Sequence, residues 1–476
     1  MQDLYDFSLH QMTPRLYDTF TRDVQPVVPM DGSVFRFYCC GPTVYGPAHV
    51  GNFRTFVMQD VFRRTLEGLG TPTRHIRNIT DVDDKTIRQS QAEGRTLTEF
   101  CADWTKKFHH DCAALNVLLP HEEPGAVEHL PDQIALIAKL IERGHAYQAA
   151  DGSVYFRIDS FPAYGALSRL TERTITTTSA LADEYERDSA ADFALWKARR
   201  PEDGPNFWPS PWGEGRPGWH IECSAMAMKH LGESFDLHGG GIDLVFPHHE
   251  NEIAQSEAAT GKRFARHWFH VAHLLVEGQK MSKSLGNLYT LEDVVARGYT
   301  SEELRYALLA GHYRQPLNFT WDSVSGAHKS LGRLRRFKER LGPPASTVGE
   351  NNPFDPVMCA LADDLNTPDA LGRLFTVVKE FSAALEAGRI TGTAQAEAAA
   401  GFQRVMEALG FTLPAEAEAA IPADIQKLAA ERWQARINKD WAASDSLRKQ
   451  LEGLGWNMRD GRDGYTLAVM TTGEDA

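Results

Sequence analysis

The sequence lacks the features of a membrane or secreted protein. No apolar run in its 476 residues approaches the roughly 20 residues of a membrane-spanning helix. Its first residues carry neither the basic stretch nor the apolar core of a secretory signal, so we expect a cytoplasmic protein. The six cysteines are few and irregularly spaced, which argues against a disulfide scaffold and favours free thiols or metal ligands.

Positive charge is also scarce. The chain has 50 Lys and Arg against 64 Asp and Glu, a formal net charge of -14 at pH 7. This argues against a uniformly basic nucleic-acid-binding surface but not against a local basic patch. Such a patch lies in residues 425–450, where Arg432, Arg436 and Lys439 follow helical spacing and are predicted to share one face. That face is either a solvated helix surface or a nucleic-acid contact.

Local patterns predict an α/β fold followed by helices. Residues 34–40 are aromatic and β-branched, residues 52–69 have helical periodicity, and residues 73–79 form a second predicted strand. This order is a βαβ unit, which predicts a parallel sheet. The length predicts two to four domains. Further along, we predict an insertion from about 115 to 215, a linker at 342–349, helices at 354–409, and a basic helix with a strand pair at the end of the chain.

A thiol and a phosphate-binding turn lie close together near the predicted first strand. Cys40 ends that strand, and nine residues later His49 begins the sequence His-Val-Gly-Asn, which ends at Asn52. Glycine permits close backbone approach, and the start of a helix favours anions. The His49 imidazole can donate to a phosphate oxygen as charge builds in a transition state.

A second pattern suits a metal ion. His248 and Glu252 are four residues apart, which places both side chains on one helix face. With Cys40 and Cys223 they would supply two thiolates, an imidazole and a carboxylate, a donor set that suits tetrahedral zinc. The alternative is that the two cysteines pack as small apolar side chains.

Two further segments suit a nucleotide. Residues 280–287 place Lys280 and Lys283 among small hydroxyl residues, as expected of a mobile loop whose ammonium groups neutralise a pyrophosphate. The alternative is a solvated pair of lysines. The run Gly239-Gly240-Gly241 before Asp243 predicts either a platform for ribose and adenine or an ordinary glycine-rich turn.

Together these residues resemble the cysteinyl-tRNA synthetases, a family of class I aminoacyl-tRNA synthetases, along nearly the whole chain. The similarity rests on five motifs in the same order: Cys40 to Tyr45, Asn78 to Lys85, Gly218 to Ser224, Phe246 to Glu252, and Lys280 to Asn287. The resemblance implies activation of L-cysteine by ATP, with Mg2+, to cysteinyl-adenylate. It also implies transfer of the cysteine to the terminal adenosine of tRNA(Cys) by a monomeric, zinc-containing enzyme.

The resemblance also assigns residues. It implies Cys40, Cys223, His248 and Glu252 as zinc ligands, Thr80, Trp219 and His238 in the amino-acid pocket, and His49, Lys280 and Lys283 as catalytic residues. It implies nucleotide contacts at Gly41, Thr43, His49, Asn52, Gly239, Asp243 and Lys283. One departure stands out: the family's phosphate motif often ends in a second histidine, and here that residue is Asn52, which cannot become cationic.

The expected architecture is a Rossmann-like parallel sheet with an insertion domain, then a mainly helical half and a small α/β end domain. We assign catalytic halves to 1–114 and 215–290, an insertion to 115–214, a stem-contact region to 291–343, a helical bundle to 350–412 and an anticodon-binding domain to 421–476. Two alternatives compete with this interpretation, and the first shares adenylation and zinc with it. One is the cysteine ligase of mycothiol synthesis, which is expected to lack an RNA-reading end, and the other is an inactive RNA-binding paralogue, which is expected to have lost ligands or lysines.

The resemblance suggests how cysteine is distinguished from serine. We hypothesise that zinc binds the substrate thiolate directly, because zinc favours a readily ionised thiolate over a serine hydroxyl. Hydrogen bonding alone separates such similar side chains poorly and commonly requires an editing step. No segment of the sequence demands an editing domain.

Overall fold

The computed structural model describes residues 12–170, 192–282, 285–349, 351–414, 423–454, 456–461 and 464–469. The chain forms two compact units, Met1–Thr412 and Leu413–Ala476, and each is described by itself. Within the described residues, no helix has both the length and the apolar character that crossing a bilayer requires.

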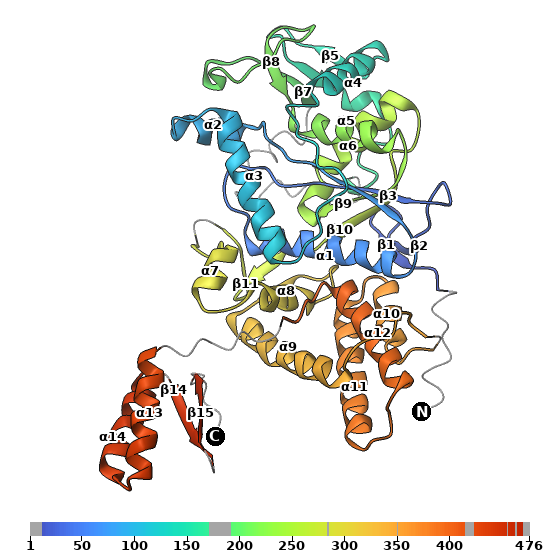
Figure 1. Ribbon diagram of the computed structural model, residues 1–476. Helices are drawn as coiled ribbons and strands as arrows, with labels where there is room; N and C mark the ends of the chain where they lie inside the picture. Colours follow the sequence, from blue (N-terminus) through green and yellow to red (C-terminus); the bar gives the residue numbers. More distant parts are fainter. Residues whose placement is uncertain are drawn as a thin grey trace. The chain divides into compact units, whose positions relative to one another are not determined.

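A four-stranded parallel sheet forms the centre of the first unit (Figure 1). Its strands, in spatial order, are β10 (Ala265–Val271), β9 (Phe235–Gly241), β3 (Phe35–Cys39) and β4 (Thr73–Arg77). The predicted βαβ unit is confirmed, because helix α1 (Val50–Gly68) joins β3 to β4. The chain places β4 beside one edge of β3 and later adds β9 beside the other edge, so the order in which strands are added reverses between β3 and β9.

Helices cover both faces of this sheet. Helix α1 lies along one face, and α5 (Trp219–Leu231) and α6 (His248–Thr260) lie along the other (Figure 1). Phe53 and Phe56 of α1 pack against Phe108 of α3 (Leu97–Ala114), which adds an aromatic layer outside α1. Helix α2 (Asp84–Ala92) precedes α3 and begins at Asp84, where Asp83 caps it.

The predicted insertion contains its own antiparallel sheet. Its strands are β5 (Ala146–Gln148), β6 (Val154–Phe156), β7 (Phe193–Ala198) and β8 (Gly215–Pro217), and α4 (Leu130–Glu142) precedes them. Phe156, Phe193 and Trp196 are buried between this sheet and its helices. The predicted polar loop near 171–190 lies outside the described residues.

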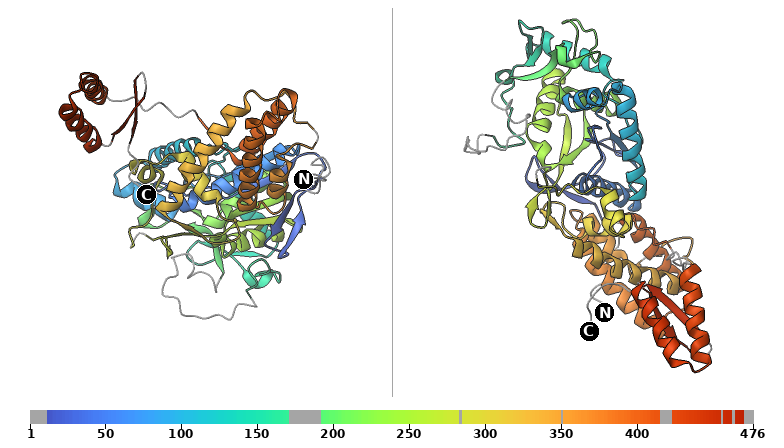
Figure 2. Two further views of the ribbon diagram at one scale, coloured as in Figure 1. Left: turned by 90° about the horizontal axis from the view of Figure 1, so that it is seen from below. Right: turned by 90° about the vertical axis from the view of Figure 1, so that its left-hand side faces the viewer.

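The rest of the first unit is mainly helical, as predicted (Figure 2). Its helices are α7 (Leu291–Ala296), α8 (Ser301–Leu309), α9 (Trp321–Leu341), α10 (Asp355–Ala362), α11 (Thr367–Glu386) and α12 (Thr393–Leu409). Two small sheets complete it: β1 (Arg15–Asp18) with β2 (Asp23–Pro26), and β11 (Leu274–Val276) between β12 (Gln279–Lys280) and β13 (Leu317–Phe319).

The second unit is a small α/β unit, which completes the predicted fold class. It consists of α13 (Ala423–Ile437), α14 (Trp441–Gly453) and the hairpin of β14 (Trp456–Asp460) and β15 (Tyr465–Val469). The prediction of one shared basic face was wrong. Helix α13 ends at Ile437, Lys439 has a positive φ of 59°, and Asp440 caps the next helix. Arg432 is buried and pairs with Asp460 instead of facing solvent.

Candidate active site

Predicted residues of the loops after β3, β4 and β9 lie at one end of the parallel sheet, at the point where the order of its strands reverses. Such a crevice is the usual ligand site of an open parallel sheet. The loops after β3 and β4 touch closely, because a Cβ on Gly41 would lie 1.7 Å from the carbonyl oxygen of Asn78. The Gly41 amide donates to Asn78 Oδ1 at 2.8 Å, and the Thr80 amide donates to the Pro42 carbonyl at 3.1 Å. These bonds fix Cys40 and Thr80 relative to each other, and Thr43 forms a single parallel bridge with Thr80.

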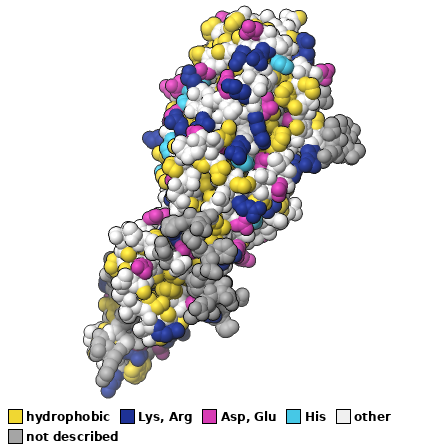
Figure 3. Space-filling view, turned by 90° about the vertical axis from the view of Figure 1, so that its right-hand side faces the viewer, with side chains coloured by type: hydrophobic (Ala, Val, Ile, Leu, Met, Phe, Trp, Pro, Cys, Tyr) yellow, Lys and Arg dark blue, Asp and Glu magenta, His cyan; other side chains and the backbone are white. Residues whose placement is uncertain are grey.

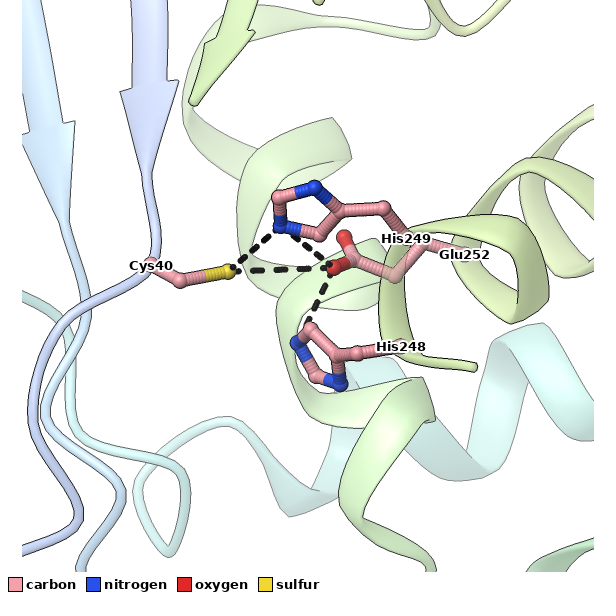
Figure 4. Close-up of side chains that lie close together, drawn as sticks. All are labelled: Cys40, His248, His249 and Glu252. Atoms are coloured by element: carbon pink, nitrogen blue, oxygen red, sulfur yellow. Dashed lines mark hydrogen bonds and ion pairs between the residues drawn. The ribbon is translucent and has the colours of Figure 1, made fainter. Parts of the chain in front are cut away.

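A buried cluster of metal-ligating side chains faces the end of β3. Cys40, His248, His249 and Glu252 each offer a ligand atom, and these atoms all lie within 4.8 Å of one another. Figure 4 shows Cys40 approaching from the β3 loop and the other three side chains from α6. Cys40 Sγ lies 3.3 Å from His249 Nε2 and 3.8 Å from Glu252 Oε1, and His248 Nε2 lies 3.0 Å from Glu252 Oε1.

Cys223 brings a second thiol to this cluster. Its Sγ lies 3.9 Å from Cys40 Sγ. Two thiolates on one tetrahedral zinc would be about 3.8 Å apart, since each zinc–sulfur bond is about 2.3 Å long. The donor chemistry and this spacing fit zinc. His249 was not predicted as a candidate ligand, although its position beside His248 was a signal that could have found it.

Burial and neighbouring charges shift the pKa values of the side chains in this cluster. Burial raises the pKa of Cys223, but hydrogen bonding to Cys40 and His248 outweighs it and lowers that pKa to about 6. Burial disfavours the charged form of His248, but Glu252 and Cys223 raise its pKa to about 10. Glu252 has its pKa lowered to about 2, because His238 and His248 outweigh its burial. Burial together with Cys223 raises the pKa of Cys40, so without a cation its thiol stays protonated.

A further layer of side chains orients these donors. His238, predicted in the amino-acid pocket, is fully buried and its Nε2 lies 2.8 Å from Glu252 Oε2. Trp219 stacks on the His248 ring with centroids 4.1 Å apart. His249 Nδ1 lies 2.7 Å from His270 Nε2. Trp219 and His238 therefore contact the donor cluster, and their contact with an amino acid stays a prediction.

His49 caps the helix that leads away from β3. Its Nδ1 accepts the Asn52 backbone N–H at 3.2 Å, and Asn52 Oδ1 accepts the His49 N–H at 3.1 Å, which together form a capping box. An imidazole that accepts at Nδ1 and is neutral carries its proton on Nε2. Burial lowers the pKa of His49, although Asp243 partly opposes this effect. The ring therefore presents a neutral Nε2–H donor at the start of α1.

The glycine run does not form the turn that was one of its two predicted alternatives. Gly239, Gly240 and Gly241 belong to β9. A Cβ on Gly239 would lie 3.2 Å from the Phe269 ring, and one on Gly241 would lie 2.3 Å from Asp243 Oδ1, so close approach accounts for both glycines. Asp243 follows in a short 3-10 turn, Ile242–Val245, and is exposed. It therefore remains available for the predicted ribose contact.

The residues on either side of Lys283 lie close to the start of α1. Lys280 is exposed at the end of β12, and a Cβ on Gly51 would lie 3.0 Å from Met281 Sδ. The Val50 amide donates to the Tyr289 carbonyl at 2.8 Å, which ties the far end of the loop to α1. Lys283 lies outside the described residues.

Comparison with known proteins gives the same family over nearly the whole chain. Residues 26–329 match the model of the tRNA synthetases class I (C) catalytic domain, and residues 356–413 match the DALR domain. A cysteine–tRNA ligase of Opitutus terrae is 53% identical over 468 residues, which cover 96% of this chain and 99% of the relative. Cysteine–tRNA ligases of Solibacter usitatus and Protochlamydia amoebophila are 43% and 42% identical, with 95% and 97% of this chain covered and 99% of each relative.

A solved structure resembles the fold. Mycobacterium tuberculosis methionyl-tRNA synthetase in complex with methionyl-adenylate superposes with a TM-score of 0.56 at 14% sequence identity. The match covers 79% of this chain and 89% of that one. At this identity the likeness concerns the fold alone.

Proposed function

This chain belongs to the cysteine–tRNA ligase family of class I tRNA synthetases, and from that premise we propose how its residues perform the reaction. The protein uses ATP to activate L-cysteine as cysteinyl-adenylate, releases pyrophosphate, and transfers the cysteine to the 3'-terminal adenosine of tRNA(Cys). The observation that supports this assignment best is the buried cluster of thiol, imidazole and carboxylate side chains that faces the end of β3. Its thiol, Cys40, is nine residues before His49 in the sequence.

Zinc is the metal that this donor set suits, with Cys40, Cys223, His248 and Glu252 as ligands. When bound, it would supply a site for the substrate thiolate that a serine hydroxyl occupies poorly. His238 holds one oxygen of Glu252 at 2.8 Å, which leaves the other oxygen facing Cys40 and His248. Such support of a ligand typically strengthens metal binding.

His49 and the two lysines of residues 280–287 would act on the phosphates of ATP. The His49 Nε2–H would donate to the α-phosphate as negative charge builds on it. Lys280 and Lys283 would neutralise the departing pyrophosphate, with Mg2+ as its counterion. Gly41, Thr43, Gly239 and Asp243 would contact the nucleotide, while Thr80, Trp219 and His238 would line or support the amino-acid pocket.

Local positive charge and exposed aromatic side chains support RNA binding in spite of the net charge of -14. Lys and Arg side chains gather over the upper part of the first unit on the face drawn in Figure 3. In the second unit, Trp441 is 57% exposed, and the Arg436 guanidinium lies 5.9 Å from its ring centroid. Aromatic and guanidinium faces of this kind stack on unpaired bases. We also propose that the end unit binds the anticodon and that the chain divides into the six ranges predicted from the sequence. We further propose that the protein is monomeric and cytoplasmic.

The test is cysteine-dependent ATP–pyrophosphate exchange, followed by charging of tRNA(Cys), with the purified protein. We expect exchange with L-cysteine but not with L-serine, and transfer to tRNA(Cys) but not to a glucosamine-inositol acceptor. Transfer to the sugar alone would favour the mycothiol ligase, and the absence of any exchange would favour the inactive paralogue.

The ligand set has its own test. Cys223→Ser should lose zinc and lose exchange together, while His249→Gln should keep its zinc. Full zinc occupancy with unchanged exchange in Cys223→Ser would contradict the proposed metal site. Loss of zinc from His249→Gln alone would replace Cys223 with His249 in the ligand set.

A further inference from the structure

Two histidines outside the candidate active site face each other where the insertion begins. His129 immediately precedes α4, and His230 lies in the last turn of α5. The Nε2 atoms of their rings are 3.0 Å apart. His129 is 7% exposed and the side chain of His230 is 19% exposed, so the pair is shielded but can be reached from solvent.

The other nitrogen of each ring faces a hydrogen-bond acceptor. His129 Nδ1 lies 2.9 Å from the Gly125 carbonyl oxygen, and His230 Nδ1 pairs with the carboxylate of Glu122. A carbonyl and an ionised carboxylate can only accept, so both Nδ1 atoms donate. A neutral imidazole has a single N–H, so each neutral ring then has a bare lone pair on Nε2. The two lone pairs point at each other, an arrangement that is repulsive unless a cation lies between them.

These two rings have the hydrogen bonds that are typical of metal ligands. A histidine that binds a metal ion commonly donates its other ring N–H to a carboxylate or a backbone carbonyl, which fixes the tautomer and the ring orientation. Here one ring has the carbonyl and the other has the carboxylate. Two nitrogens on one tetrahedral zinc would be about 3.4 Å apart, since each zinc–nitrogen bond is about 2.1 Å long, so the rings need to separate by only about 0.4 Å.

The charges around the pair also favour a cation. The carboxylate of Glu122 lies behind His230, and the carbonyls at the end of α5 lack partners within the helix, which favours positive charge there. The neighbouring cations Arg74 and Lys229 are each paired with an acid, Arg74 with Glu122 and Lys229 with Asp132 at 2.9 Å. Their repulsion of a bound ion is therefore partly offset.

We propose that His129 Nε2 and His230 Nε2 form a second metal site, which takes a divalent transition-metal ion such as zinc. Imidazole nitrogen suits zinc, copper, iron and nickel, whereas magnesium and calcium prefer oxygen. The two rings supply two ligands, and water fills the remaining positions. This site should therefore bind zinc more weakly, and exchange it faster, than the cluster of Cys40, Cys223 and Glu252.

An ion at this pair would fasten the start of the insertion to α5. Residues 121–126 lie parallel to β4 and the residues after it, and the Ile79 amide donates to the Pro124 carbonyl at 2.9 Å. Helix α5 begins at Trp219 and carries Cys223. Because an ion that binds only the folded state stabilises it by mass action, occupation of this site should raise the unfolding temperature.

The test measures the zinc content of the full-length protein by equilibrium dialysis against rising concentrations of free zinc at neutral pH. Wild-type protein should hold one equivalent more than His129→Gln and one equivalent more than His230→Gln. The unfolding temperature of wild type should rise as that equivalent binds, and those of the two variants should not. His110→Gln is the matched control, because His110 is an exposed histidine beside Asp111 and its loss should leave the zinc content unchanged.

Two further measurements do not depend on the stability of the histidine variants. X-ray absorption by the weakly held zinc in wild type should show imidazole nitrogen and water oxygen as neighbours, without sulfur. Glu122→Gln keeps both ring nitrogens but weakens the acceptor behind His230. It should lower the zinc affinity of this site by about tenfold to a hundredfold, the usual effect of altering a group that supports a ligand.

The readout is metal content, so it is separate from the proposed reaction. Equal zinc content in wild type and both histidine variants would overturn the second site, and so would sulfur around the weakly held ion. Cys223→Ser should lose the tightly held zinc and keep the weakly held one. Unchanged zinc content in Cys223→Ser, with one equivalent still lost from both histidine variants, would contradict the ligand set around Cys40 and support the histidine pair.

Discussion

Asn52 and His49 hold each other through two hydrogen bonds at the start of α1. The side chain of Asn52 accepts the backbone N–H of His49, and the backbone N–H of Asn52 donates to the His49 ring. Asn52 stands where the family often has a second histidine, and in this chain it holds His49 in place. A neutral amide suits this task, because its oxygen can accept while no second charge is added.

The first prediction concerns which ring nitrogen of His49 acts. A glutamine amide nitrogen lies near the position of Nε2, and an asparagine amide nitrogen lies nearer to that of Nδ1. His49→Gln should therefore retain more exchange activity than His49→Asn, while His49→Ala should lose about 100-fold to 1000-fold, the usual effect of deleting a donor to a developing charge. Steady-state exchange rates at saturating ATP check this order. Equal activity of the Gln and Asn variants would contradict the assigned tautomer.

The second prediction concerns Asn52. Asn52→Ala removes the side-chain half of the capping box and should lower the exchange rate by up to about tenfold, since a lost cap costs about 1 kcal/mol and loosens His49. Asn52→Gln is the matched control, because glutamine at this helix position also reaches back to the cap residue. The Gln variant should keep most of the activity. A much larger fall in the affinity for ATP than in the rate would indicate that Asn52 acts on ATP directly.

The third prediction is that zinc affinity rises steeply with pH. In the metal-free protein the pKa of His248 is raised to about 10 and the pKa of Cys40 is also raised, so both groups hold protons at neutral pH. Metal binding must displace both protons, while Cys223, with its pKa near 6, and Glu252, with its pKa near 2, have largely lost theirs. Affinity should therefore increase about 100-fold per pH unit between about pH 7 and 8. Competition against a chromophoric chelator measures this slope, and a flat profile would contradict the protonation states.

The sequence predicted those parts of the molecule that depend on neighbours in the chain. The strand at 34–40, the helix at 52–69 and the pairing of His248 with Glu252 all follow from local periodicity, and the structure has β3, α1 and α6 there. Gly239 of β9 was harder, because what requires it is the approach of Phe269, about 30 residues further along the chain.

The fourth prediction concerns recognition of RNA by the second unit. Trp441 is exposed and carries Arg436 over its ring. If it stacks on an unpaired base, Trp441→Ala should lower kcat/KM for tRNA by about tenfold to a hundredfold, because stacking contributes about 1–3 kcal/mol per base. Pyrophosphate exchange should be unchanged, since it needs no RNA. Leu454→Ala is the control, because this exposed side chain in the same unit offers no ring, and an equal loss in both variants would contradict stacking.

The last prediction separates Arg432 from the basic residues around it. Its side chain is 4% exposed, and its two terminal nitrogens lie 2.6 Å and 3.0 Å from the two oxygens of Asp460. Arg432→Met should therefore destabilise the second unit by about 2 kcal/mol, because among the described residues Asp460 would keep only Arg436 as an ion-pair partner. Arg448→Met, which removes an exposed pair with Glu452, should cost less than about 1 kcal/mol. Thermal unfolding of the full chain, followed by tryptophan fluorescence, measures both. A loss of tRNA charging in Arg432→Met with normal unfolding would instead show that Arg432 contacts RNA, as the spacing of the basic residues had first suggested.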